Sequence, residues 1–333
     1  MDAVSVVIPN WNGLRWLPGC LTALTAQELP PAEVIVVDNG SEDGSLEYLK
    51  REHPKVRLIA FTRNTGFAQA ANAGIAAAAC EFVAMLNTDV EVAPDWLRRM
   101  VEVLRADPLL GSIACKMLQL PGRDLIYDAG DVLRRDGQCV QRGRSEIDVG
   151  RFDEPGEVFG ACAGAALYRR DALLAVGGFD DRYFAYLEDV DLALRLALSG
   201  WTCRYEPAVA WHAGAGSAAQ LPGGPERLVA RNTLLLVAKA FPARWLPIVA
   251  YRQCGWAWHA LLERRLGAHL AALASALPLL PGALRQRRCL RAQTRVAIQQ
   301  VVPARPFRGP RADGHPAQRA GGITRGCGAA AGS

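Results

Sequence analysis

The sequence predicts an α/β fold in which a mostly parallel sheet is covered by helices on both faces. Two observations carry this prediction. Apolar runs of five or six residues, the length of strands buried on both faces, alternate with helical segments over the first 110 residues. Such alternation is typical of parallel sheets. With 333 residues, half of them hydrophobic, the chain is long enough for one large domain or two modest ones.

The first part of the chain is expected to hold four strands, at residues 4–9, 34–38, 56–60 and 82–86. Helices are expected at residues 14–27, 45–51, 68–79 and 94–105. Right-handed crossovers then bring Pro9, Asp38 and Asp89 to one rim of the sheet. Open α/β folds bind ligands at this rim, so we expect the functional site there.

Residues 111–180 mix Gly, Asp and Arg with short apolar runs and give no regular pattern. Beyond them, residues 188–199 carry apolar positions at helical spacing and end at Gly200, which predicts a helix. Residues 202–211 are expected to form a strand that ends at His212. We therefore predict one domain over residues 1–240.

The C-terminal part has a different composition. Residues 241–333 hold 14 arginines against two acidic residues, a net charge of +12, whereas residues 1–240 carry −7. Residues 266–284 are apolar but are interrupted by Pro278 and Pro281, which favours an interfacial helix or hairpin over a membrane span. We predict a helical, membrane-interfacial region at 241–300 and a disordered basic tail at 301–333. A plain helix packed on the domain remains an alternative.

Composition also bounds the compartment and the activity. The nine cysteines are scattered without a CxxC pair, and no signal peptide is apparent, so we expect a cytoplasmic protein with reduced thiols. Neither a P-loop nor a GxGxxG motif occurs, which argues against ATP hydrolysis and NAD chemistry. The basic tail lacks a nucleic-acid-binding motif, so an anionic membrane surface is the expected partner and nucleic acid is not.

Three motifs carry candidate chemistry. Asn87-Thr88-Asp89 follows a buried strand, where its oxygens can bind a hard divalent cation and, through it, a diphosphate. A cap by Asp89 for the helix at 94–105 is an equal alternative. Asp38, at the tip of another strand, can accept hydrogen bonds from a base or a ribose. Gly66, after Asn64, lets the backbone and a helix N-terminus approach an anion.

Besides these three motifs, a helix is predicted to begin at Glu188, where Glu188, Asp189 and Asp191 place three carboxylates in four positions. Asp191 can pair with Arg195 at i, i+4, which leaves Glu188 and Asp189 as candidates for a general base. His212 can ligate a metal, although a structural role is about equally expected for a lone histidine.

Together, five segments resemble the family 2 inverting glycosyltransferases, which have a GT-A type fold. They are VVIPNWN at 6–12, VVDNGSEDGS at 36–45, NTGFAQAANAG at 64–74, LNTD at 86–89 and FDDRYFAYLEDVDLALRLALSG at 179–200. The resemblance covers about residues 3–240. It is strongest to bacterial rhamnosyltransferases of O-antigen or cell-wall polysaccharide synthesis, because Asn87-Thr88-Asp89 replaces the Asp-x-Asp of many relatives and Gly214 and Ser217 follow His212.

The resemblance implies a role for each matching position. The nucleotide-sugar would contact six residues, which are Pro9, Asn10, Asp38, Asn64, Gly66 and Asn87. Asp89 and His212 would hold Mg²⁺ or Mn²⁺, with Asn87 beside them. Because Asn87 replaces the first Asp of Asp-x-Asp, the metal site would carry one negative charge fewer. Asp189 would be the general base that activates the acceptor hydroxyl, and Glu188 is the alternative base.

The implied reaction is inverting transfer of a sugar to a hydroxyl of a lipid-linked or polysaccharide acceptor. The expected donor is dTDP-rhamnose, and UDP- or GDP-hexoses stay open. The expected location is peripheral, on the inner face of the bacterial cytoplasmic membrane. A non-catalytic nucleotide-sugar-binding scaffold of the same fold is the main alternative, against which the intact Glu188 and Asp189 argue. A sugar-phosphate nucleotidyltransferase is disfavoured because the chain lacks a Gly-rich, basic N-terminal loop.

Overall fold

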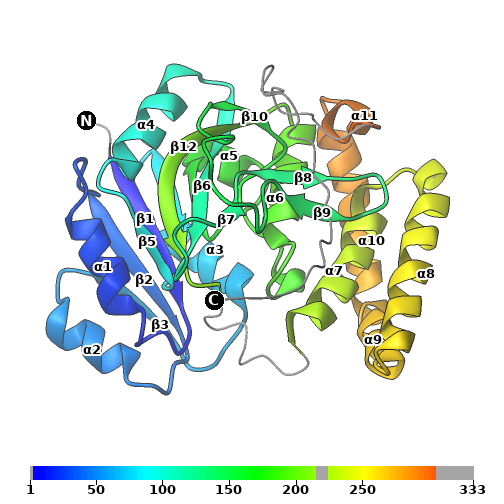
Figure 1. Cartoon of the computed structure of the whole chain (residues 1–333), viewed down its shortest axis with the longest axis horizontal. Coiled ribbons are helices and arrows are strands. Elements are labelled where there is room, and N and C mark those ends of the chain that lie inside the picture. Colours follow the sequence, from blue (N-terminus) through cyan, green and yellow to red (C-terminus); the bar gives the residue numbers. More distant parts are fainter. Residues whose placement is uncertain (1–2, 215–223, 305–333) are drawn as a thin grey trace, which may run out of the picture.

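The computed structural model describes residues 3–214 and 224–304 (Figure 1). Its first half alternates strands with helices, as predicted. Four parallel strands lie side by side in the order β4-β1-β2-β3, with β1 at Val4–Asn10, β2 at Glu33–Asn39, β3 at Arg57–Phe61 and β4 at Phe82–Leu86. The helices between them are α1 (Leu17–Thr25), α2 (Ser45–Glu52) and α3 (Phe67–Ala77).

The second half extends the same sheet through the region that gave no pattern. β11 (Ala165–Arg169) lies antiparallel between β4 and β6 (Leu110–Gln119), and β12 (Thr202–His212) runs parallel to β6. Three short strands pair at this side, namely β5 (Val90–Val92), β7 (Ile126–Asp128) and β10 (Gly156–Val158). β8 (Asp131–Leu133) and β9 (Cys139–Gln141) form a separate hairpin. The α/β fold with a mostly parallel sheet and flanking helices is confirmed.

Two hydrophobic cores, one on each face of the sheet, explain why the helices lie where they do. On one face, α1 and α4 (Trp96–Ala106) bury Leu17, Leu21 and Trp96. On the other, α3, α5 (Arg170–Ala175) and α6 (Glu188–Leu198) bury side chains such as Ile75 and Leu192. The strands between them are buried on both faces, which is why they read as continuous apolar runs.

The structure decides one alternative at Asp89. The residue after Asp89 begins β5, not a helix, and the residue at the N-cap position of α4 is Asp95. The interpretation of Asp89 as a helix cap is therefore wrong. Asp89 instead ends the β4–β5 connection at the rim where β1 and β2 also end.

A layer of helices follows β12 and stands at one side of the molecule (Figure 1). It comprises α7 (Gly224–Ala240), α8 (Leu246–Leu262), α9 (Leu266–Ala274), α10 (Leu280–Gln293) and α11 (Ile298–Val301). Leu236 and Phe241 join Leu194 of α6 in a third core, so this layer packs on the sheet domain. Because α7 contacts both parts, the proposed division at residue 240 stays a prediction.

Part of this layer remains apolar at the surface. Trp258 and Leu262 of α8 are 63% and 66% exposed, and Leu270 of α9 is 51% exposed. The helical stretch Leu266–Gln293, 28 residues long, is by length and composition able to cross a membrane. An 18-residue window within it has a mean hydropathy of 1.4, and 17% of that window is buried. The tail predicted to be disordered lies, from residue 305 on, outside the described residues.

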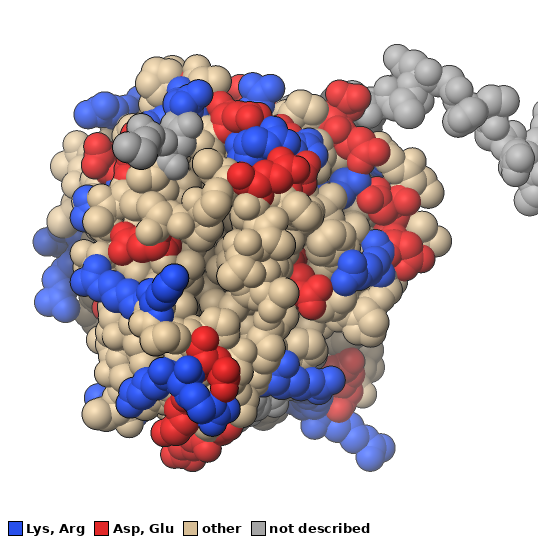
Figure 2. Space-filling view, turned by 90° about the vertical axis from the view of Figure 1, so that its left-hand side faces the viewer, with Lys and Arg blue, Asp and Glu red and all other residues tan. Residues whose placement is uncertain are grey.

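The face that carries α1 and α2 has mixed charge. Figure 2 shows basic and acidic side chains interspersed there. Arg98 pairs with Glu28 and Glu102, and Arg51 pairs with Glu52. These exposed pairs join side chains of opposite charge over short distances.

Candidate active site

A cavity of about 430 Å³ opens at the carboxyl ends of β1, β2 and β4, beside the start of α6. Nine of the ten candidate site residues line it. These are Pro9, Asn10, Asn64, Gly66, Asn87, Asp89, Glu188, Asp189 and His212. Residues far apart in the sequence thus meet at the rim that the strand order predicts.

Asp38, the tenth candidate, lies behind the residues that line the cavity. It is 2% exposed, and its two carboxylate oxygens accept hydrogen bonds from the side-chain amide of Asn10 at 2.7 Å and the backbone N–H of Ser41 at 3.0 Å. Asp38 therefore fixes the orientation of Asn10, which reaches the cavity. The amide oxygen of Asn10 has no hydrogen-bond partner in the described part of the chain and is left as an acceptor.

The turn that precedes α3 is held by Asn39, a residue that the sequence did not single out as a site. Its side-chain amide donates to Asn64 Oδ1 and to the carbonyl of Gly66, both at 3.0 Å. Gly66 has φ of 93°, and a Cβ there would lie 2.5 Å from the carbonyl oxygen of Phe184. No larger residue fits this position, because the segment before α6 passes directly over it.

Asp89 and His212 form a pair on the other side of the cavity. His212 Nε2 lies 3.2 Å from Asp89 Oδ1, because β12 places His212 opposite Val90 of β5. The second ring nitrogen, Nδ1, is buried with no hydrogen-bond partner among the described residues. The ring packs edge-on against Tyr127, with 4.3 Å between the ring centroids.

This donor set fits a divalent metal that also binds substrate. Carboxylate oxygen and imidazole nitrogen are both ligands of Mn²⁺ and Mg²⁺, although Mg²⁺ prefers oxygen. Among residues 3–214 and 224–304, no group of three or more His, Cys, Asp and Glu side chains is arranged to hold a metal. A metal at Asp89 and His212 would thus complete its coordination with phosphate oxygens and water, as Mg²⁺ commonly does.

Glu188 and Asp189 face the cavity from the first turn of α6. Asp189 Oδ2 accepts a hydrogen bond from the backbone N–H of Ala163 at 3.2 Å, which fixes the carboxylate. Burial raises the pKa of Asp189, although the backbone N–H groups of Ala163 and Val190 oppose the shift. Burial also raises the pKa of Glu188, and the charge of Asp189 raises it further. Glu188 Oε2 is buried without a hydrogen-bond partner in the described chain.

More buried acids stand near this pair. Asp131 lines the cavity, and Asp128 is buried at the end of β7, where its Oδ1 accepts a hydrogen bond from Gly130 N–H at 2.8 Å. Burial raises the pKa of Asp128 to about 7, and the charge of Asp189 contributes in the same direction. Burial and the charge of Asp128 raise the pKa of Asp131. The site therefore gathers carboxyl groups that hold protons more strongly than exposed ones do.

The segment just before α6 has an unusual backbone. Phe184, Tyr186 and Leu187 all have positive φ, at 64°, 69° and 63°. Such conformations are unfavourable for residues with side chains and persist only when surrounding contacts hold them. The contacts come from Asn232 of α7, whose amide lies 3.0, 2.9 and 2.6 Å from the carbonyl oxygens of Tyr183, Ala185 and Tyr186.

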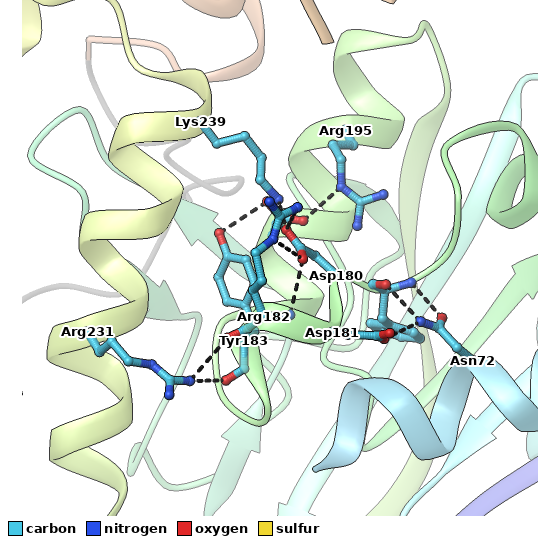
Figure 3. Close-up of polar contacts among 10 residues, drawn as sticks. Asn72, Asp180, Asp181, Arg182, Tyr183, Arg195, Arg231 and Lys239 are labelled. Atoms are coloured by element: carbon cyan, nitrogen blue, oxygen red, sulfur yellow. Dashed lines mark hydrogen bonds and ion pairs between the residues drawn. The ribbon is translucent and has the colours of Figure 1, made fainter. Parts of the chain in front are cut away.

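A buried network of ion pairs also holds the segment before α6 in place (Figure 3). Lys239 of α7 is 1% exposed and pairs with both Asp180 and Asp191. Asp191 also accepts hydrogen bonds from Arg195, at 2.7 Å, and from the Tyr183 hydroxyl, at 3.1 Å. Burial alone would raise the pKa of Asp191, but Lys239 and Arg195 outweigh it and hold that pKa below its usual range. The predicted Asp191–Arg195 pair is thus present.

Several residues at the site were not predicted from the sequence. Tyr127, Asp131, Arg144 and Ala163 lie in the region that gave no pattern. Asn232, which holds the segment before α6 and does not itself line the cavity, lies on a helix that the sequence analysis did not single out. Arg144 is the one arginine or lysine in the wall formed by the described residues. The small-residue run FGACAGAALY at 159–168, which contains Ala163, was the available signal for close approach of backbone to the site.

Comparisons with known proteins identify the family of this chain and support its fold. The profile of the family described as Glycosyl transferase family 2 matches residues 5–177. The N-acetylglucosaminyl-diphospho-decaprenol L-rhamnosyltransferase of Mycobacterium tuberculosis is 28% identical over 301 residues, which cover 81% of this chain and 91% of that protein. Succinoglycan biosynthesis protein ExoO of Rhizobium meliloti is 40% identical over 152 residues, which cover 45% of this chain and 39% of ExoO.

Solved structures share the fold. GalNAc-T7 with UDP, GalNAc and Mn²⁺ superimposes with a TM-score of 0.56 at 16% identity, over 71% of this chain and 48% of that one. S. aureus TarS 1-349 in complex with UDP gives a TM-score of 0.53 at 17% identity, over 87% of each chain. At these identities, the likeness supports the fold alone.

Proposed function

This chain belongs to glycosyl transferase family 2 and is a glycosyltransferase, and we propose that it transfers L-rhamnose from dTDP-rhamnose to a lipid-linked acceptor. One observation carries the proposal. The Asp89–His212 pair and the carboxylates of Glu188 and Asp189 line one cavity. One pair can therefore act on the leaving diphosphate while the other acts on the attacking hydroxyl. The name of the rhamnosyltransferase relative, 91% of which this chain covers, supports L-rhamnose as the sugar and a lipid-linked acceptor.

In the proposed mechanism, Asp189 is the general base. Its raised pKa brings it nearer to the operating pH, which favours proton transfer from an acceptor hydroxyl. The hydroxyl oxygen attacks the anomeric carbon as the bond to the nucleoside diphosphate breaks, and one displacement inverts the anomeric configuration. Glu188, beside Asp189, is the alternative base, and its unpartnered Oε2 can accept a hydrogen bond from the acceptor.

The donor is proposed to bind across the rim of the sheet. Pro9, Asn10, Asn64, Gly66 and Asn87 contact the nucleotide-sugar, and Asp38 acts by holding Asn10. Asp89 and His212 hold Mn²⁺ or Mg²⁺, which supplies positive charge beside the diphosphate. Two structural neighbours contain Mn²⁺, one with UDP and GalNAc and one with GDP-Man, which supports a divalent metal here.

The helices beyond residue 240 are proposed to keep the enzyme at the inner face of the cytoplasmic membrane. Exposed apolar side chains on α8 and α9, together with the arginines of α10, suit an anionic lipid surface. The lipid-linked substrate in the name of the rhamnosyltransferase relative agrees with this location.

Thermal stabilisation of the full-length protein by dTDP, UDP and GDP, each with and without Mn²⁺, tests the donor. We expect a metal-dependent rise in the melting temperature with dTDP that exceeds the rises with UDP and GDP. A larger rise with UDP or GDP would keep the glycosyltransferase and overturn rhamnose as the sugar. No rise with any nucleotide would favour a non-catalytic protein of this fold.

A further inference from the structure

Arg144 brings a positive charge to the wall of the catalytic cavity, and its exposed side chain is accessible to a ligand there. Across residues 3–214 and 224–304, its guanidinium lies within ion-pair distance of no carboxylate. Four carboxylates line the same cavity, those of Asp89, Asp131, Glu188 and Asp189. An anion can bind in such a cavity only where positive charge outweighs the acids. Among the described lining residues, Arg144 supplies such a charge, and a metal at Asp89 would supply another.

The guanidinium of Arg144 lies over the tyrosine ring that also supports a proposed metal ligand. Its central carbon is 3.9 Å from the centre of the Tyr127 ring, and it donates a hydrogen bond to the Tyr127 carbonyl at 3.3 Å. The same ring packs against His212, with 4.3 Å between the ring centroids. Because a guanidinium has five N–H donors, others remain for a ligand. A ligand with two linked phosphates can therefore contact a metal at His212 through one phosphate and Arg144 through the other.

The backbone on both sides of Arg144 is held in an unusual conformation. Gly143 and Ser145 have positive φ, at 72° and 64°, which is unfavourable for the serine. The backbone N–H of Ser145 donates a hydrogen bond to the carbonyl of Ile126 at 2.9 Å, one residue before Tyr127. A strained backbone persists only where surrounding contacts hold it. The turn that carries Arg144 is thus fixed against β7, the strand that carries Tyr127.

We propose that Arg144 binds the terminal phosphate of the leaving nucleoside diphosphate and stabilises the negative charge that develops there. The bond between the anomeric carbon and the phosphate oxygen breaks with both electrons on that oxygen. The acceptor oxygen bonds to the same carbon, and its proton passes to Asp189. A guanidinium suits this task because its planar fork matches two phosphate oxygens and keeps its charge at any working pH. The inference rests on the proposed function for the reaction, whereas its binding test does not.

Binding of diphosphates and of a monophosphate tests the assignment separately from transfer. Isothermal titration calorimetry with Mn²⁺ measures the affinities of dTDP, dTMP and inorganic pyrophosphate for the full chain. We expect Arg144→Gln to weaken dTDP and pyrophosphate at least tenfold and dTMP less than twofold. Arg151→Gln is the matched control, because Arg151 is an exposed arginine nearby that lies over the Phe152 ring at 5.3 Å but does not line the cavity. It should bind all three probes like the wild type.

The outcomes separate this role from a structural one and from the proposed function. Equal weakening of dTDP and dTMP by Arg144→Gln would overturn the assignment, because Arg144 would then act only by packing on Tyr127. Unchanged dTDP affinity with a raised KM for a diphospho-lipid acceptor would also overturn it, because the cation would then bind the acceptor. If the wild type transfers sugar, Arg144→Gln should lower kcat about 10²-fold. Arg144-dependent pyrophosphate binding by a chain that transfers no sugar would support the phosphate site and overturn only the proposed function.

Discussion

The side-chain amide nitrogen of Asn232 lies 2.6 Å from the carbonyl oxygen of Tyr186, two residues before Glu188. The contact joins α7 to a segment whose backbone is otherwise unfavourable, and Asn232 is itself fully buried. The geometry of the carboxylates at the start of α6 thus depends on α7, a helix of the layer that follows β12. We infer that α7 couples the C-terminal helices to the position of the proposed base.

Replacing Asn232 by alanine tests this coupling. The loss leaves buried carbonyls without donors, which should lower the free energy of unfolding by about 1–3 kcal/mol. It should also lower kcat, because the carboxylates at the start of α6 lose the contacts that position them. Thr233→Ala, which removes a hydrogen bond to Val229 within α7, is the matched control for destabilisation. Equal losses of kcat in both variants at equal stability would contradict the positioning role.

Asp128 should make stability depend on pH. Burial raises its folded-state pKa from 3.8 to about 7, so the folded protein keeps a proton that the unfolded chain releases. Its contribution to stability is therefore present below about pH 4 and is lost as the pH rises through about 7. Between these two values, the loss amounts to roughly 1.4 kcal/mol for each step of one in pH. Asp128→Asn, which keeps an acceptor for Gly130, should melt at a higher temperature than the wild type at pH 8 but not at pH 5.

Asp107 offers a matched control for this measurement. Its carboxylate makes the same contact, with a backbone N–H two residues later at 2.8 Å, but at the surface. Asp107→Asn, melted beside the wild type at pH 5 and pH 8, is the control for the substitution itself. If both variants respond to pH alike, the buried position of Asp128 does not control the effect.

Asn87 should limit the affinity for the metal. Asn87→Asp adds a second carboxylate beside Asp89, and charge on the ligands tightens the binding of hard cations. With a nucleoside diphosphate present, the Mn²⁺ concentration for half-maximal thermal stabilisation should fall about tenfold. Asp89→Asn should raise it. An Asn87→Asp variant with unchanged Mn²⁺ dependence would place the metal elsewhere.

Membrane attachment is best tested by point substitution. Truncation at residue 240 would remove Phe241 and Leu290 and expose Leu236, which shares a core with them, so it would confound attachment with folding. Trp258→Glu combined with Leu262→Glu places charge on the exposed apolar face of α8 and should abolish flotation with phosphatidylglycerol vesicles. Leu174→Glu, an exposed apolar position on α5, should float like the wild type. Flotation of all three proteins would refute attachment through α8.

The sequence predicted the first half of the fold well because each strand there is short, apolar and followed by a helix. It missed β6 and β11 because their strands lie among polar and small residues, and an antiparallel insertion leaves no regular period. Nine of the ten candidate residues line the cavity. Those at strand ends could be predicted because a polar residue follows an apolar run there, and Glu188 and Asp189 because carboxylates crowd at the start of a helix. Asn232 was missed because its partner Tyr186 is 46 residues away, a distance over which only the tertiary structure brings them together.

The most direct test is transfer of sugar by the purified full-length enzyme to an N-acetylglucosaminyl-diphospho-lipid, followed by mass spectrometry and NMR of the product. With dTDP-L-rhamnose and Mn²⁺, we predict addition of one rhamnose with inversion at the anomeric carbon. Asp189→Asn should lower kcat by about 10²- to 10⁴-fold while the dTDP-dependent thermal shift persists. Retention of configuration, or near-normal turnover by Asp189→Asn, would contradict Asp189 as the base of an inverting transfer.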